Sequence, residues 1–474
     1  MRAAVNRFWA PVYGALLVVA LTWPFLVPGE AFALRDMMVF DSMALTRASL
    51  GWGDLAARNV PQDALLGILP WPVAFLRVFM VAAAGGAAWA GYRFGRSTFG
   101  QAAAMTVAVW NPFVVERLLQ GQWSLAAAAW LLPLVALGVH PASGLAHWAA
   151  SLTPTGALAA ACVARGWRGF AISVCTCLPW VVAGVFAGAD GTSSAASAGA
   201  FAPRAEAYVG TLGSLLGLGG IWNGQAVPAS REAGFALFGV ALFALLALSW
   251  RAVPRRFMFL AALGFAVALA SWAGLTAPFV QHFPGGGLLR DGQKWLILAI
   301  PAFVAAAGAL EPRRALAAAA FALLQVPDAP VALAALTPTT VEVPAVDHRG
   351  RDVLFESRPA LLPIDGHPVV DPAPKAMNVV ESGALTVDGV AVDAPSLRWS
   401  AAQAALDDQE RLRELGVGVV VRADGSVTDT GAPARPLPPA GVALFALWCV
   451  VPLLQCVRNH TGTRQRSYQR VSRN

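Results

Sequence analysis

The chain has 474 residues, of which 57% are hydrophobic and only 13% charged, and its mean hydropathy is +0.58. An ordinary soluble domain is about a quarter charged, so this chain has too little charge to cover a water-facing surface, and lipid must cover most of it. The basic residues that give its net charge of +7 cluster at the ends of apolar runs, which indicates membrane topology and argues against a nucleic-acid partner.

Apolar runs of spanning length, about 20 residues, occur near residues 9–28, 71–91, 98–115, 124–139, 169–187, 233–250, 256–275, 295–310, 313–335 and 439–456. The first run is long enough to span the bilayer and no small-residue cleavage site follows it, so we do not expect a cleaved signal peptide. The stretch 143–164 is interrupted by Thr153-Pro154-Thr155-Gly156, and we predict two short helices that meet at the outer interface.

Arginine positions decide the topology. With the N-terminus inside, a return at 153–156 gives about twelve crossings and places every cluster on the cytoplasmic side. These clusters are Arg93 and Arg96, Arg165 and Arg168, Arg251, Arg255 and Arg256, and Arg313 and Arg314. Counting 143–164 as one span would move the later clusters outside. We therefore predict a multi-pass plasma-membrane protein with cytoplasmic N- and C-termini and outer segments at 29–70, 111–123, 153–156, 188–232, 276–294 and 336–436.

The segment 338–434 is more charged than the rest. Asp388-Gly389 within LTVDGVAV predicts a tight hairpin, and a helix from Ser400 to Leu415 precedes a strand in GVGVVVRA. We predict an all-α polytopic membrane bundle with a small extracytoplasmic α/β domain. The expected parts are a membrane module at 1–337, the outer domain at 338–434, a final transmembrane helix at 435–457 and a basic cytoplasmic tail at 458–474.

The first outer loop carries candidate catalytic residues. Arg35 and Asp36 follow the first span by one or two turns, where a carboxylate can act as general base on a sugar hydroxyl while guanidinium groups hold a phosphate. Asp41 is a second candidate base, and Arg58 and Asp63 are candidate substrate contacts. The alternative is an amphipathic interfacial helix with solvated charges.

A second candidate site is LLRDGQKW, just before a span. Cations at the outer interface suit the phosphate of a lipid-linked substrate, whose charge stays near headgroup level. The alternative is a snorkelling anchor beside Trp295. The candidate binding residues are Arg290, Asp291, Gln293 and Lys294.

Two further outer segments carry polar side chains. In WNPFVVERLLQGQW, Glu116 and Arg117 are candidate substrate contacts, although Arg117 can equally form an architectural ion pair with Glu116 or with a first-loop carboxylate. In GGIWNGQAVPASRE, Trp222 and Asn223 offer a stacking face and an amide, as a sugar ring requires.

Several common site classes are not indicated. The chain has no Walker loop, GxGxxG, HExxH or GxSxG motif. Its six histidines form no ligand spacing, and its five cysteines form neither a disulfide framework nor a CxxC metal knuckle. We predict no metal site and no cofactor.

The motifs RDMMVFD, VPQDALL, WNPFVVERLLQGQW, SLTPTG and LRDGQKW resemble those of an actinobacterial family of GT-C-like membrane proteins. The resemblance covers most of the membrane part. It implies transfer of a sugar, of the arabinofuranose or mannose class, from a polyprenyl phosphate donor to a cell-envelope glycan or glycolipid acceptor. In such enzymes the loop-one acid is the base, which corresponds to Asp36, and basic residues hold the lipid phosphate, which corresponds to Arg290 and Lys294. Many relatives carry paired adjacent acids, whereas here the next acid is Asp41.

Two other functions remain open. A polyprenyl-lipid transporter would line its path with charges, but Asp328 is the one acid expected in mid-span. A non-catalytic scaffold would use the outer domain to hold envelope-assembly partners.

Overall fold

The structure, a computed structural model, describes residues 2–187, 194–283, 285–387 and 389–457, without the side chains of 2–8 and 454–457. The described chain is mostly helical, with small sheets. The predicted turn residue Asp388 and the predicted cytoplasmic tail at 458–474 lie outside the described residues.

Six helical segments are long and apolar enough to cross a membrane. They are α1 (Arg2–Thr22) with the 3-10 turn η1 (Trp23–Leu26), α3 (Pro72–Phe94), α4 (Thr98–Val109) with α5 (Pro112–Leu119), α9 (Gly166–Phe186), α14 (Arg255–Trp272), and α17 (Pro312–Leu324) with α18 (Ala329–Ala332) and η6 (Leu333–Leu336). Shorter apolar helices are α6 (Trp123–Leu137), α8 (Pro154–Val163), α13 (Ala236–Ala247), η5 (Gln293–Ala299) with α16 (Ile300–Ala309), and α22 (Pro439–Val457). The chain is thus a multi-pass membrane protein, while about twelve crossings stays a prediction.

Two helix interruptions are present, one at Asn111-Pro112 and the predicted one at 153–156. Asn111 ends the run that begins at α4, because its Oδ1 accepts a hydrogen bond of 3.0 Å from the Val114 backbone N–H and caps α5. Thr153 caps α8 in the same way, with its Oγ1 accepting from the Gly156 N–H at 3.3 Å. The stretch 143–164 therefore forms two short helices, α7 (Ala142–Ala150) and α8.

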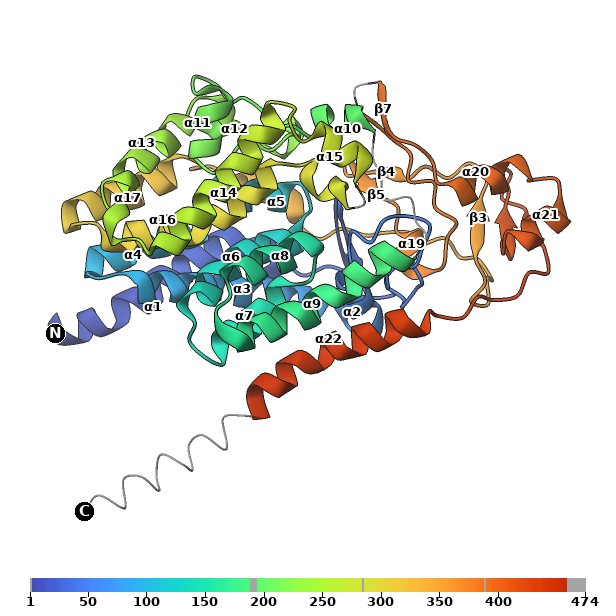
Figure 1. The fold of residues 1–474 in the computed structure, drawn as a ribbon, viewed down its shortest axis with the longest axis horizontal. Coiled ribbons are helices and arrows are strands. Elements are labelled where there is room, and N and C mark those ends of the chain that lie inside the picture. The colour runs from blue at the N-terminus through green and yellow to red at the C-terminus, as the bar shows by residue number, and fades with distance from the viewer. Residues whose placement is uncertain (1, 188–193, 284, 388, 458–474) are drawn as a thin grey trace, which may run out of the picture.

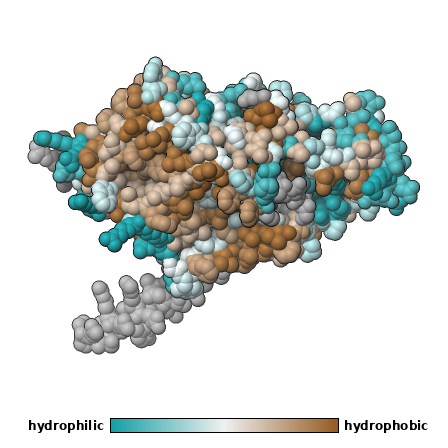
Figure 2. Space-filling view, turned by 45° about the horizontal axis from the view of Figure 1, so that its top comes forward, coloured by the Kyte–Doolittle hydropathy of each residue, from teal (hydrophilic) through white to brown (hydrophobic). Residues whose placement is uncertain are grey.

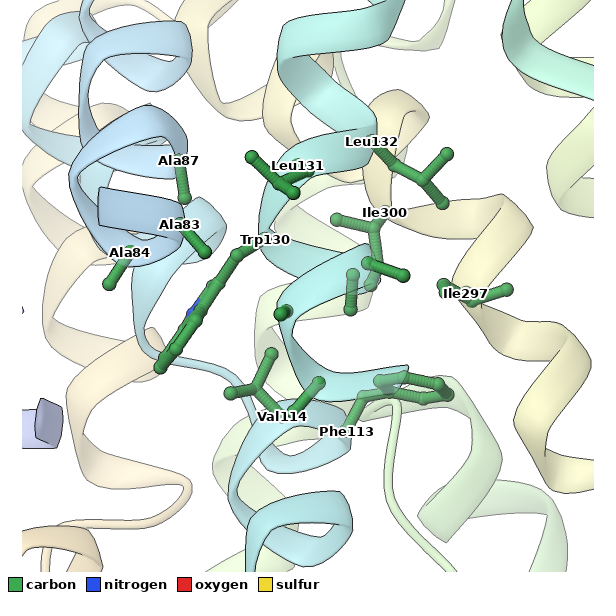
Figure 3. Packing of buried hydrophobic residues seen from close by; sticks show 14 of the residues in the cluster. Ala83, Ala84, Ala87, Phe113, Val114, Trp130, Leu131, Leu132, Ile297 and Ile300 are labelled. Atoms are coloured by element: carbon green, nitrogen blue, oxygen red, sulfur yellow. The ribbon is translucent and has the colours of Figure 1, made fainter. Parts of the chain in front are cut away.

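The core of the bundle is built from small residues around α6. Figure 3 shows Trp130 of α6 beside Ala83 and Ala84 of α3, with Ile297 and Ile300 on the other side of α6. The Trp130 indole N–H donates to the Val109 carbonyl at 3.0 Å, so the buried ring is hydrogen-bonded. Small side chains allow such close helix packing in a membrane, where hydrophobic exclusion from water does not drive association.

The long axis of the molecule separates two polar ends. The start of α1 lies at one end, and helices α20 (Leu397–Ala404) and α21 (Gln409–Glu414) lie at the opposite end (Figure 1). These two helices belong to the segment 338–434, which is called the outer domain after its predicted side of the membrane. Figure 2 shows a largely hydrophobic surface over the helices and a hydrophilic surface around the outer domain. Arg96 bonds to the Ala252 carbonyl at 3.2 Å and Arg256 to that of Ala164 at 2.7 Å, so the arginine clusters near these residues lie together. A shared side is what the predicted topology requires.

The first outer loop forms a β-hairpin rather than the amphipathic helix considered as its alternative. Strands β1 (Ala31–Leu34) and β2 (Met37–Phe40) pair antiparallel, and most of their side chains are buried. The other elements outside the long helices are α2 (Gln62–Ile68), α10 (Ala195–Ala200), α11 (Gly210–Leu216), η2 (Gly224–Ala226), α12 (Ala229–Glu232), η3 (Trp250–Ala252), α15 (Ala277–His282) and η4 (Gly286–Leu289).

The segment 338–434 contains helices and small sheets. Strand β3 (Val353–Phe355) runs parallel to β8 (Val419–Val421), which pairs antiparallel with β9 (Val427–Asp429). The other elements are the hairpins β4 (Leu361–Ile364) with β5 (His367–Val370) and β6 (Leu385–Val387) with β7 (Val390–Asp393), and helices α19 (Ala373–Ala376), α20 and α21. The predicted strand in GVGVVVRA is present as β8. The single helix predicted at Ser400–Leu415 is wrong, because Asp408 caps a separate helix, α21, with its Oδ1 2.9 Å from the Arg411 nitrogen.

Salt bridges join the outer domain to the first loop. Lys375 lies 2.8 Å from Asp63, and Arg398 lies 3.3 Å from Asp54. The Val370 N–H also donates to the Arg35 carbonyl at 2.9 Å, next to the tip of the β1–β2 hairpin. These contacts place the outer domain beside the loop that carries the candidate base.

Candidate functional site

Asp36 lies at the tip of the first-loop hairpin. The register pairs Leu34 with Met37, which leaves Arg35 and Asp36 as a two-residue turn, and Arg35 has the positive φ of 49° that such turns favour. The Arg35 guanidinium is buried and donates to the carbonyls of Leu119 and, at 2.7 Å, Gln225. Arg35, expected to contact substrate, therefore holds the turn against neighbouring segments.

The Asp36 carboxylate differs from the other aspartates of this loop. Asp54 and Asp63 are in salt bridges with the outer domain, and Asp41 accepts a hydrogen bond from the Val73 N–H at 3.0 Å, at the start of α3. Asp36 is solvent-exposed and its Oδ2 accepts from the Gln122 amide at 3.0 Å. Both candidate bases are solvent-exposed, but Asp41 accepts a backbone N–H at the start of a helix, whereas Asp36 contacts a side-chain amide.

The surroundings of Asp36 raise the pKa of its carboxyl group above the usual aspartate value. Partial desolvation by the surrounding protein is the larger effect, and hydrogen bonds from Gln122 and Gln120 and the charges of Arg58 and Arg290 oppose it. A general base gains proton affinity from such a shift while remaining ionised at neutral pH when the shift is moderate.

Two cations, Arg58 and Arg290, lie near the Asp36 carboxylate, and Lys294 lies near both of these arginines. Arg290 pairs with Asp393 of the outer domain at 2.7 Å and stacks over the Phe201 ring at 4.2 Å. Arg58 lies 3.4 Å from the Asp393 carboxylate, but 57% of the Arg58 side chain is exposed. Lys294 interacts electrostatically with both arginines, and the described residues include no carboxylate within salt-bridge distance of its ammonium group.

Arg117 and Asp291 connect the two motifs that the sequence singled out. The Arg117 guanidinium donates two hydrogen bonds, of 2.5 and 3.0 Å, to the Asp291 carboxylate. It also donates to the side-chain oxygens of Gln122, at 2.7 Å, and Gln293. The partners considered from the sequence, Glu116 or a first-loop carboxylate, are therefore not the observed ones. Because Gln122 in turn donates to Asp36, this buried network orients the amide that contacts the candidate base.

Glu116 belongs to a second buried network. Arg231 pairs with both carboxylate oxygens of Glu206 and lies 3.5 Å from Glu116. The other Glu116 oxygen accepts from the Ile221 N–H at 3.0 Å, which fixes the segment that carries Trp222 and Asn223. Glu116, a candidate substrate contact, is fully buried and holds this backbone segment.

Asn223 and Trp222 lie next to the hairpin. The Asn223 amide donates to Gln120 at 2.7 Å, and the Asp36 N–H donates to the Gln120 carbonyl at 3.1 Å. The Trp222 ring packs edge-on against Phe201 with centroids 4.5 Å apart.

The structure brings Asp36, Arg58, Gln122 and Arg290 together, and Lys294 lies near the two arginines, although these residues come from three separate segments. Asp63 lies in the salt bridge to the outer domain, away from this cluster of interactions. Sequence reasoning missed Gln122 and Asp393. Gln122 lies within a motif already singled out, whereas no local pattern marks Asp393.

Comparison with protein-family models, with curated proteins and with solved structures found no match. Within the described residues, no three His, Cys, Asp or Glu side chains group as metal ligands.

Gly121 allows the hairpin tip to lie where it does. A Cβ at this position would stand 2.1 Å from the Leu34 carbonyl oxygen and 2.4 Å from the Met37 nitrogen, at a φ of +82°. We expect Gly121→Ala to lower stability by about 1–3 kcal/mol more than backbone strain alone, because the hairpin must shift. Gly138→Ala is the matched control, since its φ of +66° brings similar strain into open space. Equal losses of unfolding free energy in the two variants, measured in one detergent, would show that the close contact is absent.

Proposed function

We propose that this chain is a membrane glycosyltransferase that moves a sugar from a polyprenyl phosphate donor to a cell-envelope glycan or glycolipid. The observation that carries the proposal is the exposed Asp36 carboxylate near Arg58 and Arg290, with Lys294 near the same two arginines. A base and a set of cations are the groups that displacement of a phosphate by a hydroxyl requires. In the proposed topology, with both termini cytoplasmic, this site faces the outside.

The proposed reaction is a single displacement. The acceptor hydroxyl oxygen bonds to the anomeric carbon while Asp36 takes the hydroxyl proton. The bond from the anomeric carbon to the phosphate oxygen breaks, and polyprenyl phosphate leaves with the bonding electrons. The Gln122 hydrogen bond engages Oδ2, and the carboxylate keeps lone pairs that can take the proton.

Phosphate binding falls mainly to two of the three cations. Arg290 is paired with Asp393 and stacked on Phe201, so Asp393 already neutralises much of its positive charge. The described residues place no carboxylate within salt-bridge distance of Lys294, although Asp291 attracts its charge, and Arg58 is exposed with a long contact to Asp393. A donor phosphate between Lys294 and Arg58 would receive two positive charges near the membrane surface, where a lipid-linked phosphate lies.

Lys294→Ala tests the assignment of the phosphate site. Loss of a charge-assisted contact should raise the apparent KM for the polyprenyl-linked donor about tenfold or more, with kcat nearly restored at saturating donor. Steady-state transfer of a radiolabelled sugar by the purified protein in nanodiscs measures both constants. Arg413→Ala on the exposed face of α21 is the control for a general change in charge. An unchanged KM in Lys294→Ala would remove Lys294 from the donor site, and no transfer by the unaltered protein with any polyprenyl donor would favour a scaffold.

A further inference from the structure

A cavity of about 420 Å³ lies beside the candidate site, between the segment after α9 and the outer domain. Its wall includes Ala196, Ala200, Pro203, Arg204, Trp222 and Val390. The volume is within the range of small-molecule pockets, and this pocket is open to solvent, with polar and apolar surface contributing similarly to its wall.

Arg204 supplies the charge in this wall. Its Nε and Nη2 atoms are shielded from solvent and have no hydrogen-bond partner among the described residues. The backbone of Arg204 is held by a 3.0 Å hydrogen bond from its N–H to the Gly220 carbonyl. Buried donors of a charged group are costly when unpaired, and the described part of the wall contains no carboxylate. An oxyanion in the pocket would pair with the positive charge of this guanidinium.

Trp222 supplies a flat apolar surface in the same wall. Its ring is held by the edge-on contact with Phe201, whose own face carries the Arg290 guanidinium at 4.2 Å. A held indole ring can stack on the apolar face of a sugar at little conformational cost. The aromatic pair also makes the cavity a neighbour of Arg290, although neither Asp36 nor Lys294 lines it.

We propose that this cavity binds a saccharide that carries a negative charge, with the sugar ring on Trp222 and the oxyanion on Arg204. The oxyanion is a phosphate or a carboxylate, and the shared chemistry is a sugar ring next to an oxygen-borne charge. The site needs no turnover, so its occupancy stands apart from the transfer reaction: an inactive Asp36→Asn variant should bind the same ligands.

Calorimetric titration of the full chain in nanodiscs tests this site with four probes: glucose 6-phosphate, glucuronate, glucose and inorganic phosphate. We expect the phosphate or the carboxylate sugar to bind at least about tenfold more tightly than glucose and than inorganic phosphate. The preferred charged sugar identifies the oxyanion. Tight binding of inorganic phosphate equal to that of the sugars, or equal binding of glucose, would overturn the proposal.

Variants locate the binding. Arg204→Gln should remove the preference for the charged sugar, whereas Arg413→Gln on α21 should keep it. Ala196→Trp, at an exposed position of α10, should fill the cavity and abolish binding while Arg204 stays unchanged. This variant tests the site even if Arg204→Gln does not fold. Unchanged affinity in Ala196→Trp would exclude this cavity.

Discussion

Asp36→Asn should lower sugar transfer by about 10²–10⁴-fold, which is the usual contribution of a general base. Asparagine keeps the shape of the side chain and can still accept the hydrogen bond from Gln122, so the protein should fold, insert and bind donor normally. The loss should appear in kcat, with an unchanged apparent KM for the donor, in contrast to Lys294→Ala. Single-turnover transfer of a radiolabelled sugar measures the chemical step directly.

The matched control is Asp41→Asn, because Asp41 accepts a backbone hydrogen bond at the start of α3 and lies outside the cation cluster. It should affect stability slightly and turnover little. Transfer at the unaltered rate by Asp36→Asn, or a loss in Asp41→Asn of the same size and in kcat alone, would reject Asp36 as the base.

The pH profile provides a second check on Asp36. A base acts when deprotonated, so the rate should fall as pH drops through its pKa. Since desolvation raises that pKa, the acid limb should lie above the usual aspartate value of about 3.9. Residual transfer by Asp36→Asn should lack this limb. An acid limb at or below the usual value in the unaltered protein would contradict the environment described for this carboxylate.

Local patterns in the sequence predicted several parts of the structure. Caps with a following proline, as in Asn111-Pro112 and Thr153-Pro154, mark helix starts because they satisfy free N–H groups locally. Charged residues among apolar runs identified the segments near Asp36 and Arg290, since few other residues there can do chemistry.

Partners across the fold could not be predicted in the same way. Asp393 reaches Arg290 only because the β6–β7 hairpin lies against the membrane part, and nothing near Asp393 in the chain signals this. The role of Arg35 likewise depends on carbonyls at Leu119 and Gln225. The number of crossings stays a prediction, because several of the apolar runs form helices shorter than the six long ones.

Arg117→Met should destabilise the protein by about 3–5 kcal/mol, the usual cost of leaving one member of a buried ion pair alone. Arg117 is fully buried and Asp291 is 7% exposed, so water cannot replace the lost guanidinium. The Gln122 side-chain oxygen would also lose the guanidinium that donates to it. The amide that donates to Asp36 would then no longer be held in place. Denaturant unfolding in mixed micelles measures the loss.

The double variant Arg117→Met/Asp291→Leu decides what that loss means. Removing both charges eliminates the unpaired carboxylate, so the double variant should be more stable than Arg117→Met alone. Arg411→Met breaks the exposed Arg411–Glu414 pair, whose side chains are 54% and 59% exposed, and should cost less than about 1 kcal/mol. The single variant Asp291→Leu completes the comparison. If the stability losses of Arg117→Met and Asp291→Leu simply add in the double variant, Arg117 and Asp291 are not coupled. If they are coupled but transfer does not recover with stability, the pair is needed for the geometry of the Gln122–Asp36 contact as well as for folding.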